Sequence, residues 1–99
     1  MTIYRLTPRA VEDLRQVARY TKKQWGHQQR DIYIKRILQR CSWLAAHPRL
    51  GRRRPDLHPD YYCFPEGQHL IFYRIDDKAI AIIGILHQSM DVDSALKTP

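Results

Sequence analysis

The sequence predicts an α+β domain whose elements follow the order β-α-α-β-β-β, an antiparallel sheet with a helical hairpin packed on one face. Two consecutive segments repeat apolar residues every three to four positions, which is typical of amphipathic helices. Three shorter runs near the C-terminus are rich in Ile, Tyr and Phe, and turn residues separate them, as in a meander of strands. The chain has 99 residues, which suffices for one core and not for two, so we expect one domain over residues 1–99.

The N-terminal third is expected to hold a short strand over 2–6 and a helix over 8–26. The first segment alternates in side-chain type, which is the period of a strand. Thr7 is suited to cap the first free N–H groups of the helix, and Pro8 is suited to its first position. Gly26 is suited to end the helix.

A second helix is expected over 28–47, because its apolar stripe runs to Ala45 and Pro48 then stops it. The connection to the first helix leaves room only for a tight turn, so the two helices should form an antiparallel hairpin. Cys41 lies on the apolar stripe and is expected to be buried as a small hydrophobic residue.

The C-terminal half is expected to be a loop followed by three strands. Residues 48–60 contain three prolines and one glycine, which indicates a loop. The strands and the turns between them are expected in the order 61–64, 65–68, 69–75, 76–78 and 79–87. The last strand is apolar almost throughout and should be covered on both faces. The first strand must join this sheet, because an isolated strand is unstable. The remainder has room for one helical turn or a short strand.

The net charge of +7 is unevenly distributed along the chain. Residues 1–54 carry a net charge of +11 and residues 55–99 a net charge of −4. A strongly basic half favours a polyanion or an acidic protein as partner, without distinguishing the two. The densest run, Arg49 to Arg54, could hold a phosphate backbone or an acidic peptide, or it could be a solvated loop that binds nothing.

Several kinds of site have no supporting motif. The two cysteines and five histidines lack the spacings of metal sites, and the serines lack a GxSxG elbow. We therefore expect no metal and no cofactor. The longest apolar stretch, Ala79 to Leu86, is too short to span a bilayer, and the N-terminus has no apolar signal core, so we expect a cytoplasmic protein.

Two histidines are expected to meet at one end of the sheet. If the last two strands pair through the turn between them, His69 and His87 lie at the outer ends of that hairpin. With Tyr73 and Arg74 they could form an acid–base group. The interpretation we favour is that both histidines are half-buried and satisfied by backbone groups.

Two motifs near the C-terminus are specific, GQHLIFYR at 67–74 and ILHQSMD at 85–91. Three others precede them in order: YRLT at 4–7, the segment 20–26, and His47-Pro48 followed by Gly51. Together they span nearly the whole chain, which resembles ParE, the toxin of type II toxin–antitoxin modules in the RelE/ParE superfamily.

The resemblance implies the small RelE-like β-α-α-β-β-β fold and a toxin that poisons DNA gyrase, arrests replication and growth, and is not an enzyme. It also implies a hetero-oligomer with a cognate antitoxin. The ribbon-helix-helix half of that antitoxin would bind operator DNA, and its tail would bind the toxin. Relatives of the RelE type cleave mRNA on the ribosome, which is the alternative function. A detoxified or stand-alone binding module is a third.

These activities give two sets of candidate residues, and neither is assigned a catalytic role. Gyrase is expected to contact the end of the last strand and its surroundings through Arg74, His87, Met90 and Asp91. An acidic amphipathic tail of the antitoxin is expected to fill an exposed apolar groove and to contact Arg15, Arg19, Arg36, Arg40, Arg52, Arg53 and Arg54.

The ribonuclease alternative depends on cations, which stabilise the charge that develops when RNA is cleaved. The last 45 residues contain only three, Arg74, Lys78 and Lys97. In addition, Tyr62 stands where ParE relatives often carry arginine. Both observations weaken the alternative, which stays open because the arginines at 52–54 could fold over the sheet.

Overall fold

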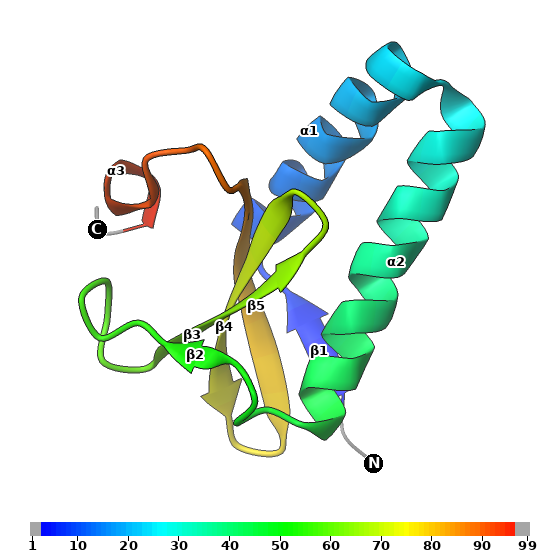
Figure 1. Ribbon diagram of the computed structural model, residues 1–99. Helices are drawn as coiled ribbons and strands as arrows, with labels where there is room; N and C mark the ends of the chain where they lie inside the picture. Colours follow the sequence, from blue (N-terminus) through cyan, green and yellow to red (C-terminus); the bar gives the residue numbers. More distant parts are fainter. Residues whose placement is uncertain (1–2, 97–99) are drawn as a thin grey trace.

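The computed structural model describes residues 3–96 and contains three helices and a five-stranded sheet in that range (Figure 1). The elements are β1 (Ile3–Leu6), α1 (Pro8–Trp25), α2 (His27–Ala46), β2 (Arg52–Arg53), β3 (Tyr61–Glu66), β4 (His69–Asp76), β5 (Ala79–His87) and α3 (Val92–Leu96). The strand order is β1-β5-β4-β3-β2. The α1–α2 hairpin packs on one face of the sheet, and α3 packs on the other. This confirms the predicted fold class, while Thr2 and Lys97 lie outside the described residues.

The helical hairpin begins and turns where the sequence predicts. The Thr7 side chain accepts a hydrogen bond from the Ala10 N–H at 3.2 Å, which caps α1. Gly26 alone joins the helices, with a φ of 90° and an N–H that donates to the Lys22 carbonyl at 2.9 Å. Neither long helix is apolar enough over its length to cross a membrane, and this holds for every helix in residues 3–96.

One strand direction differs from the prediction. β3, β4 and β5 form the expected antiparallel meander, but β1 pairs with β5 in parallel, with Ile3 opposite Ala79 and Leu6 opposite Ile82. The expectation of an antiparallel sheet is therefore wrong at this edge. The physical reason is the long connection through the hairpin and the meander, because a parallel pair needs a crossover rather than a tight turn.

Two segments expected outside the strands belong to the sheet. Arg52–Arg53, inside the predicted loop, pair with β3 as the edge strand β2. Pro65 and Glu66, predicted to turn, continue β3. Gly67 has a φ of 59°, so a two-residue turn led by glycine replaces the longer turn that the composition indicated.

The core lies on both faces of the sheet because side chains alternate along each strand. Ile82 and other residues of the sheet face the hairpin and pack with Leu44 of α2. Leu86 lies on the opposite face and packs with Leu57 of the long loop and with α3. Both faces of β5 are thus covered, as predicted, and Cys41 is fully buried.

Helix α1 runs beside β5 where β1 ends. The strand β1 reaches only as far as Ile82. Thr7 donates its hydroxyl proton to the Ile82 carbonyl at 2.8 Å. Further along, the buried Asp13 carboxylate accepts the Ile85 N–H at 3.0 Å. The helix therefore satisfies a backbone donor of β5 that no neighbouring strand reaches.

Candidate partner-binding groove

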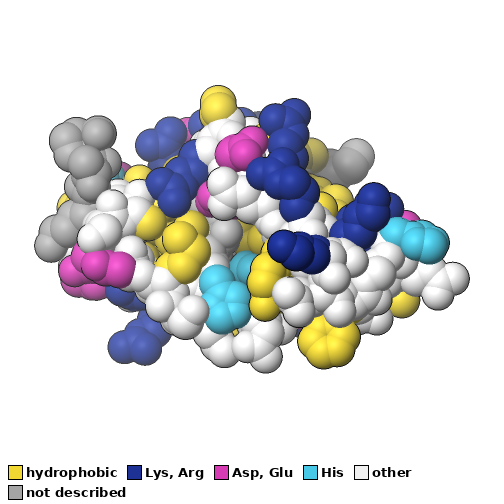
Figure 2. Space-filling view, turned by 90° about the horizontal axis from the view of Figure 1, so that it is seen from above, with side chains coloured by type: hydrophobic (Ala, Val, Ile, Leu, Met, Phe, Trp, Pro, Cys, Tyr) yellow, Lys and Arg dark blue, Asp and Glu magenta, His cyan; other side chains and the backbone are white. Residues whose placement is uncertain are grey.

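A groove lies where the hairpin meets the end of β4 and β5, and we call it the histidine groove. It consists of two cavities of about 660 Å³ and about 620 Å³ that share Tyr20, His69 and His87. Figure 2 looks down on the molecule from above and shows histidine side chains near the middle of this face, with hydrophobic side chains beside them. The residues of the groove used below are Arg9, Asp13, Tyr20, Trp25, Tyr33, Arg36, His69, His87 and Met90.

The two histidines are in contact, as the sequence predicts. His69 and His87 are opposite each other in the β4–β5 register. Their ring centroids are 5.3 Å apart and the rings are nearly perpendicular, at 85°. His69 is only 8% exposed. Burial, together with the neighbouring His87, lowers the pKa of His69 to about 4, so His69 is neutral at physiological pH.

The hydrogen bonds of the histidines differ in part from the expected backbone partners. The Tyr33 hydroxyl lies 2.5 Å from His69 Nδ1, and it also accepts the Gln68 N–H at 3.0 Å. His87 Nδ1 accepts the Ser89 N–H at 3.1 Å and lies 2.7 Å from the Ser89 hydroxyl. Backbone satisfaction is therefore correct for His87 and wrong for His69, because Tyr33 from α2 reaches across to the sheet.

The rim of the groove is apolar and exposed. Trp25 is 72% exposed, Tyr20 is 60% exposed and Met90 is 46% exposed. Large exposed apolar side chains around a concave surface are typical of protein interaction sites. The exposed apolar groove expected from the sequence is thus present, and it extends toward the end of the hairpin where Gly26 joins the two helices.

Two arginines line the groove, and both are held by carboxylates. Arg9 Nε lies 3.4 Å from Asp13 Oδ2, and Arg9 Nη1 donates to the Ala95 carbonyl at 2.6 Å. Arg36 Nη2 lies 3.3 Å from the buried carboxylate of Glu66. The groove therefore combines a neutral His69 with arginines that are already engaged by carboxylates.

The four residues expected to contact gyrase are not all together. His87 and Met90 line the histidine groove. Asp91 follows Met90 and accepts hydrogen bonds from the hydroxyl and the N–H of Ser94, which lies within α3. Arg74 was expected nearby, and this placement is wrong. It lies five residues along β4 from His69, about 17 Å away at the rise of a strand, and 4.0 Å from Asp76.

The seven arginines expected to contact an antitoxin lie in three places. Arg15 and Arg19 both pair with Glu12 on the exposed side of α1. The Glu66 carboxylate binds Arg36 and, at 2.9 Å, Arg40. The remaining three lie at and after β2: Arg54 pairs with Asp56, whereas Arg52 and Arg53 form no ion pair in residues 3–96.

The three aromatic residues of the groove, Tyr20, Trp25 and Tyr33, were not identified from the sequence as part of a site. The last buried residue of α1 is Thr21, so the helix continues for one turn, which includes Trp25, beyond the region that the sheet covers. Tyr33 lies on the apolar stripe of α2, where a packing role and a site role give the same pattern.

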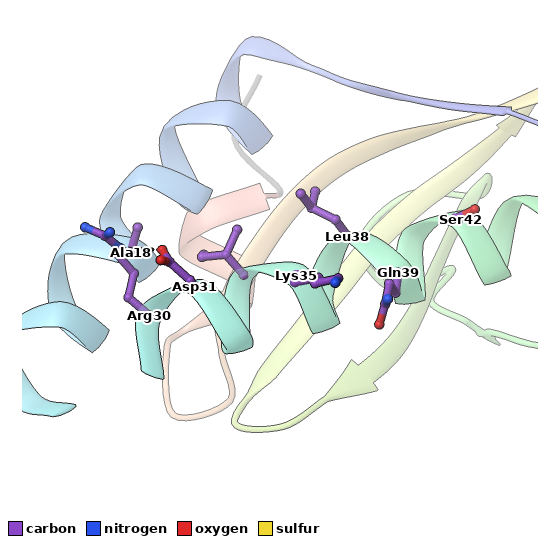
Figure 3. Close-up of a pocket in the computed structure, with 8 residues that line it drawn as sticks. Ala18, Arg30, Asp31, Lys35, Leu38, Gln39 and Ser42 are labelled. Atoms are coloured by element: carbon purple, nitrogen blue, oxygen red, sulfur yellow. Dashed lines mark hydrogen bonds and ion pairs between the residues drawn. The ribbon is translucent and has the colours of Figure 1, made fainter. Parts of the chain in front are cut away.

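A separate cavity of about 500 Å³ follows the seam between the helices on the outside of the hairpin. Figure 3 shows Ala18 from α1 beside the residues that α2 contributes, Leu38 among them. Of the charged groups there, Arg30 and Asp31 pair with each other at 3.0 Å. This seam offers little polar chemistry, so the histidine groove is the stronger candidate site.

Comparison with known proteins identifies the family. The family model described as "ParE toxin of type II toxin-antitoxin system, parDE" matches residues 4–92. This chain belongs to the ParE toxin family. Toxin ParE1 of Mycobacterium tuberculosis is 34% identical over 94 residues, which cover 94% of this chain and 96% of the relative. Toxin ParE1 of Caulobacter vibrioides is 33% identical over 97% of this chain and 99% of its own length.

Solved structures of toxin–antitoxin proteins share the fold. A chain of the chromosomal ParDE system from P. aeruginosa superimposes with a TM-score of 0.73 at 19% identity, covering 88% of this chain and 95% of the other. A chain of the RelBE2 complex from Mycobacterium tuberculosis has a TM-score of 0.63 at 20% identity, covering 88% and 98%. The protein is therefore a ParE-type toxin of a type II toxin–antitoxin system, in a fold that RelE-type proteins share.

Proposed function

We propose that this ParE-family protein acts in the cytoplasm as a poison of DNA gyrase, and that a ribbon-helix-helix antitoxin neutralises it by occupying the histidine groove. Family membership supports a toxin. The observation that favours a poison over a ribonuclease is the pairing of Arg9 and Arg36 with carboxylates beside the two histidines.

Cleavage of RNA requires catalytic groups that this groove does not provide. A base must take the 2′-OH proton, an acid must protonate the leaving oxygen, and cations must stabilise the extra negative charge. His69 is neutral and bonded to Tyr33. The lining arginines already hold carboxylates, Arg9 that of Asp13 and Arg36, together with Arg40, that of Glu66. Tyr62, where relatives often carry arginine, is buried against Tyr73 and adds no cation. The groove is better suited to binding a protein surface than to phosphoryl transfer.

To test this, the purified protein is incubated with gyrase and supercoiled plasmid and, in a parallel reaction, with ribosomes that are translating an mRNA. We expect DNA cleaved and trapped on gyrase, with intact mRNA.

Met90→Ala should reduce the amount of DNA trapped on gyrase about tenfold or more if this exposed side chain anchors the contact. Ile32→Ala is the matched control, because Ile32 is 53% exposed on α2 and outside the groove. Codon-positioned mRNA cuts with unaffected gyrase would reject the poison and restore the ribonuclease alternative.

Antitoxin binding is expected to depend on the aromatic rim of the groove. Trp25→Ala should weaken the complex by about 30-fold or more, because truncating a buried aromatic anchor costs about 2 kcal/mol or more. The Ile32→Ala control should change the dissociation constant by less than about threefold. Calorimetry at several salt concentrations should also show weaker binding as salt rises, because the hairpin carries exposed cations. Equal effects of the two substitutions would place the antitoxin elsewhere on the toxin.

A further inference from the structure

The arginines of this protein fall into two groups, those that pair with carboxylates and those that do not, and the sequence alone does not show which arginine belongs to which group. The chain has twelve arginines, all within the described residues. Nine of them form ion pairs with carboxylates: Arg5, Arg9, Arg15, Arg19, Arg30, Arg36, Arg40, Arg54 and Arg74. Of the three that form none in residues 3–96, two make up the edge strand β2 and the third precedes it in the turn after α2. They are Arg49, Arg52 and Arg53, all exposed, and we call them the β2 arginines.

The two arginines within β2 belong to opposite faces of the sheet. Arg52 is opposite Cys63, whose side chain packs in the cluster on the α3 face, and Arg53 is opposite Tyr62 in the cluster under the hairpin. The Arg53 guanidinium lies over the Tyr62 ring at 5.8 Å and donates to the Pro59 carbonyl at 2.7 Å. Arg53 is therefore oriented by neutral partners, and its charge is left for an external anion.

The segment that carries these arginines is fixed to the core. The hydroxyl of the fully buried Tyr73 donates to the Pro48 carbonyl at 2.8 Å and accepts the Gly51 N–H at 3.0 Å. Burial raises the pKa of Tyr73 to about 12, so the hydroxyl keeps its proton at physiological pH. Because the backbone is already fixed, less loop entropy is lost when this segment binds a partner than when a free basic loop does.

From this placement we propose that the β2 arginines bind the phosphate backbone of duplex DNA. Unpaired guanidinium groups favour phosphate oxygens, and their exposed position allows approach by a rigid duplex. β2 is the edge strand of the five-stranded sheet, and cations on its two faces would reach phosphates on the two sides of a groove of the duplex that lies along this edge. This contact needs no gyrase, so it goes beyond the proposed function.

An acidic protein segment fits this edge less well. β2 is two residues long, so a strand added alongside it would gain few backbone hydrogen bonds. An acidic helix presents its carboxylates from one side, whereas Arg52 and Arg53 lie on opposite faces of the strand. A duplex has phosphates on both sides of a groove, which matches this arrangement.

The test measures the binding of the purified toxin to a fluorescent 20-base-pair duplex by anisotropy at several salt concentrations, with no gyrase or antitoxin present. The variant is Arg49→Gln/Arg52→Gln/Arg53→Gln. The control is Lys22→Gln/Lys23→Gln/Lys35→Gln, which removes three exposed cations of the hairpin that form no ion pair within residues 3–96 and gives the same net charge. Thermal unfolding of both variants verifies that they are folded.

The arginine variant is expected to bind at least about tenfold more weakly at 50 mM salt. Its slope of log affinity against log salt should fall by about 3, one unit for each phosphate that an arginine no longer neutralises. The lysine control should bind less than about threefold more weakly than the original protein. Replacing the same three arginines by lysine should retain most of the affinity. Equal weakening in the two Gln variants would show a dependence on net charge alone and overturn the proposal. An acidic peptide that binds the β2 arginines more tightly than the duplex would also overturn it.

Discussion

Replacing Gly51 with alanine is expected to lower the free energy of unfolding by about 3 kcal/mol, as overpacking of a rigid core does. A Cβ atom at Gly51 would overlap the hydroxyl and Cζ of Tyr73. Tyr73 is fully buried, so its ring has no space into which to move. The clash must be relieved by shifting the 48–51 segment, which would break both hydrogen bonds of the Tyr73 hydroxyl.

A double-mutant cycle with urea unfolding separates this clash from a general intolerance of the loop. Tyr73→Phe alone should cost about 1–3 kcal/mol, because it leaves a donor and an acceptor without their partner. Tyr73→Phe/Gly51→Ala should cost clearly less than the sum of the single changes, since the oxygen that the new Cβ meets is gone. Strict additivity of the two costs would contradict the account. Gly26→Ala is a useful comparison, because a Cβ there meets no atom within 4 Å and only the φ of 90° disfavours it.

Acidification from pH 7.5 to pH 5 is expected to cost about 2 kcal/mol of stability through His69 alone, following the linkage between pKa and folding. The pKa of His69 is about 4 in the folded protein, below its ordinary value of 6.5. Between these values the unfolded state binds more protons, so stability is complete above about pH 6.5 and is lost as the pH falls toward 4. The titratable groups that contact His69 are His87 on β5 and Tyr33 on α2.

The measurement is urea unfolding at half-unit steps of pH from 7.5 to 5. His69→Gln should remove most of the pH dependence in this range, because glutamine cannot be protonated there. His58→Gln is the control, since His58 is exposed. A pH dependence that persists in His69→Gln and disappears in His87→Gln would show that His87, and not His69, is responsible.

Local signals were enough for most of the fold. Thr7, Pro8 and Gly26 gave the ends of α1 because capping depends on residues a few positions apart. The β4–β5 register followed from the position of the turn, which also predicted that His69 meets His87. The direction of β1 was not predicted, because hydrophobic alternation specifies which face a residue takes and not the direction of a neighbouring strand.

The site was less predictable, since it depends on contacts between distant segments. The expectation that Arg74 lies near His87 failed because strand length, and not sequence proximity to a motif, sets that separation. Seven arginines looked alike in the sequence, yet Glu66 binds two of them and Glu12 another two. Only the folded arrangement shows which arginines have no carboxylate partner within residues 3–96. The role of Tyr33 likewise depends on β4 reaching the start of α2.

The buried Asp13 has a consequence for how this toxin avoids aggregation. Exposed edges of β-sheets are templates onto which other chains add strands. Beyond the short β1, the edge of β5 is occupied by a helix whose carboxylate already holds the Ile85 N–H. An incoming strand would find that donor taken and a helix in its path. The protein is thereby protected, along this part of its most apolar strand, from forming intermolecular sheets.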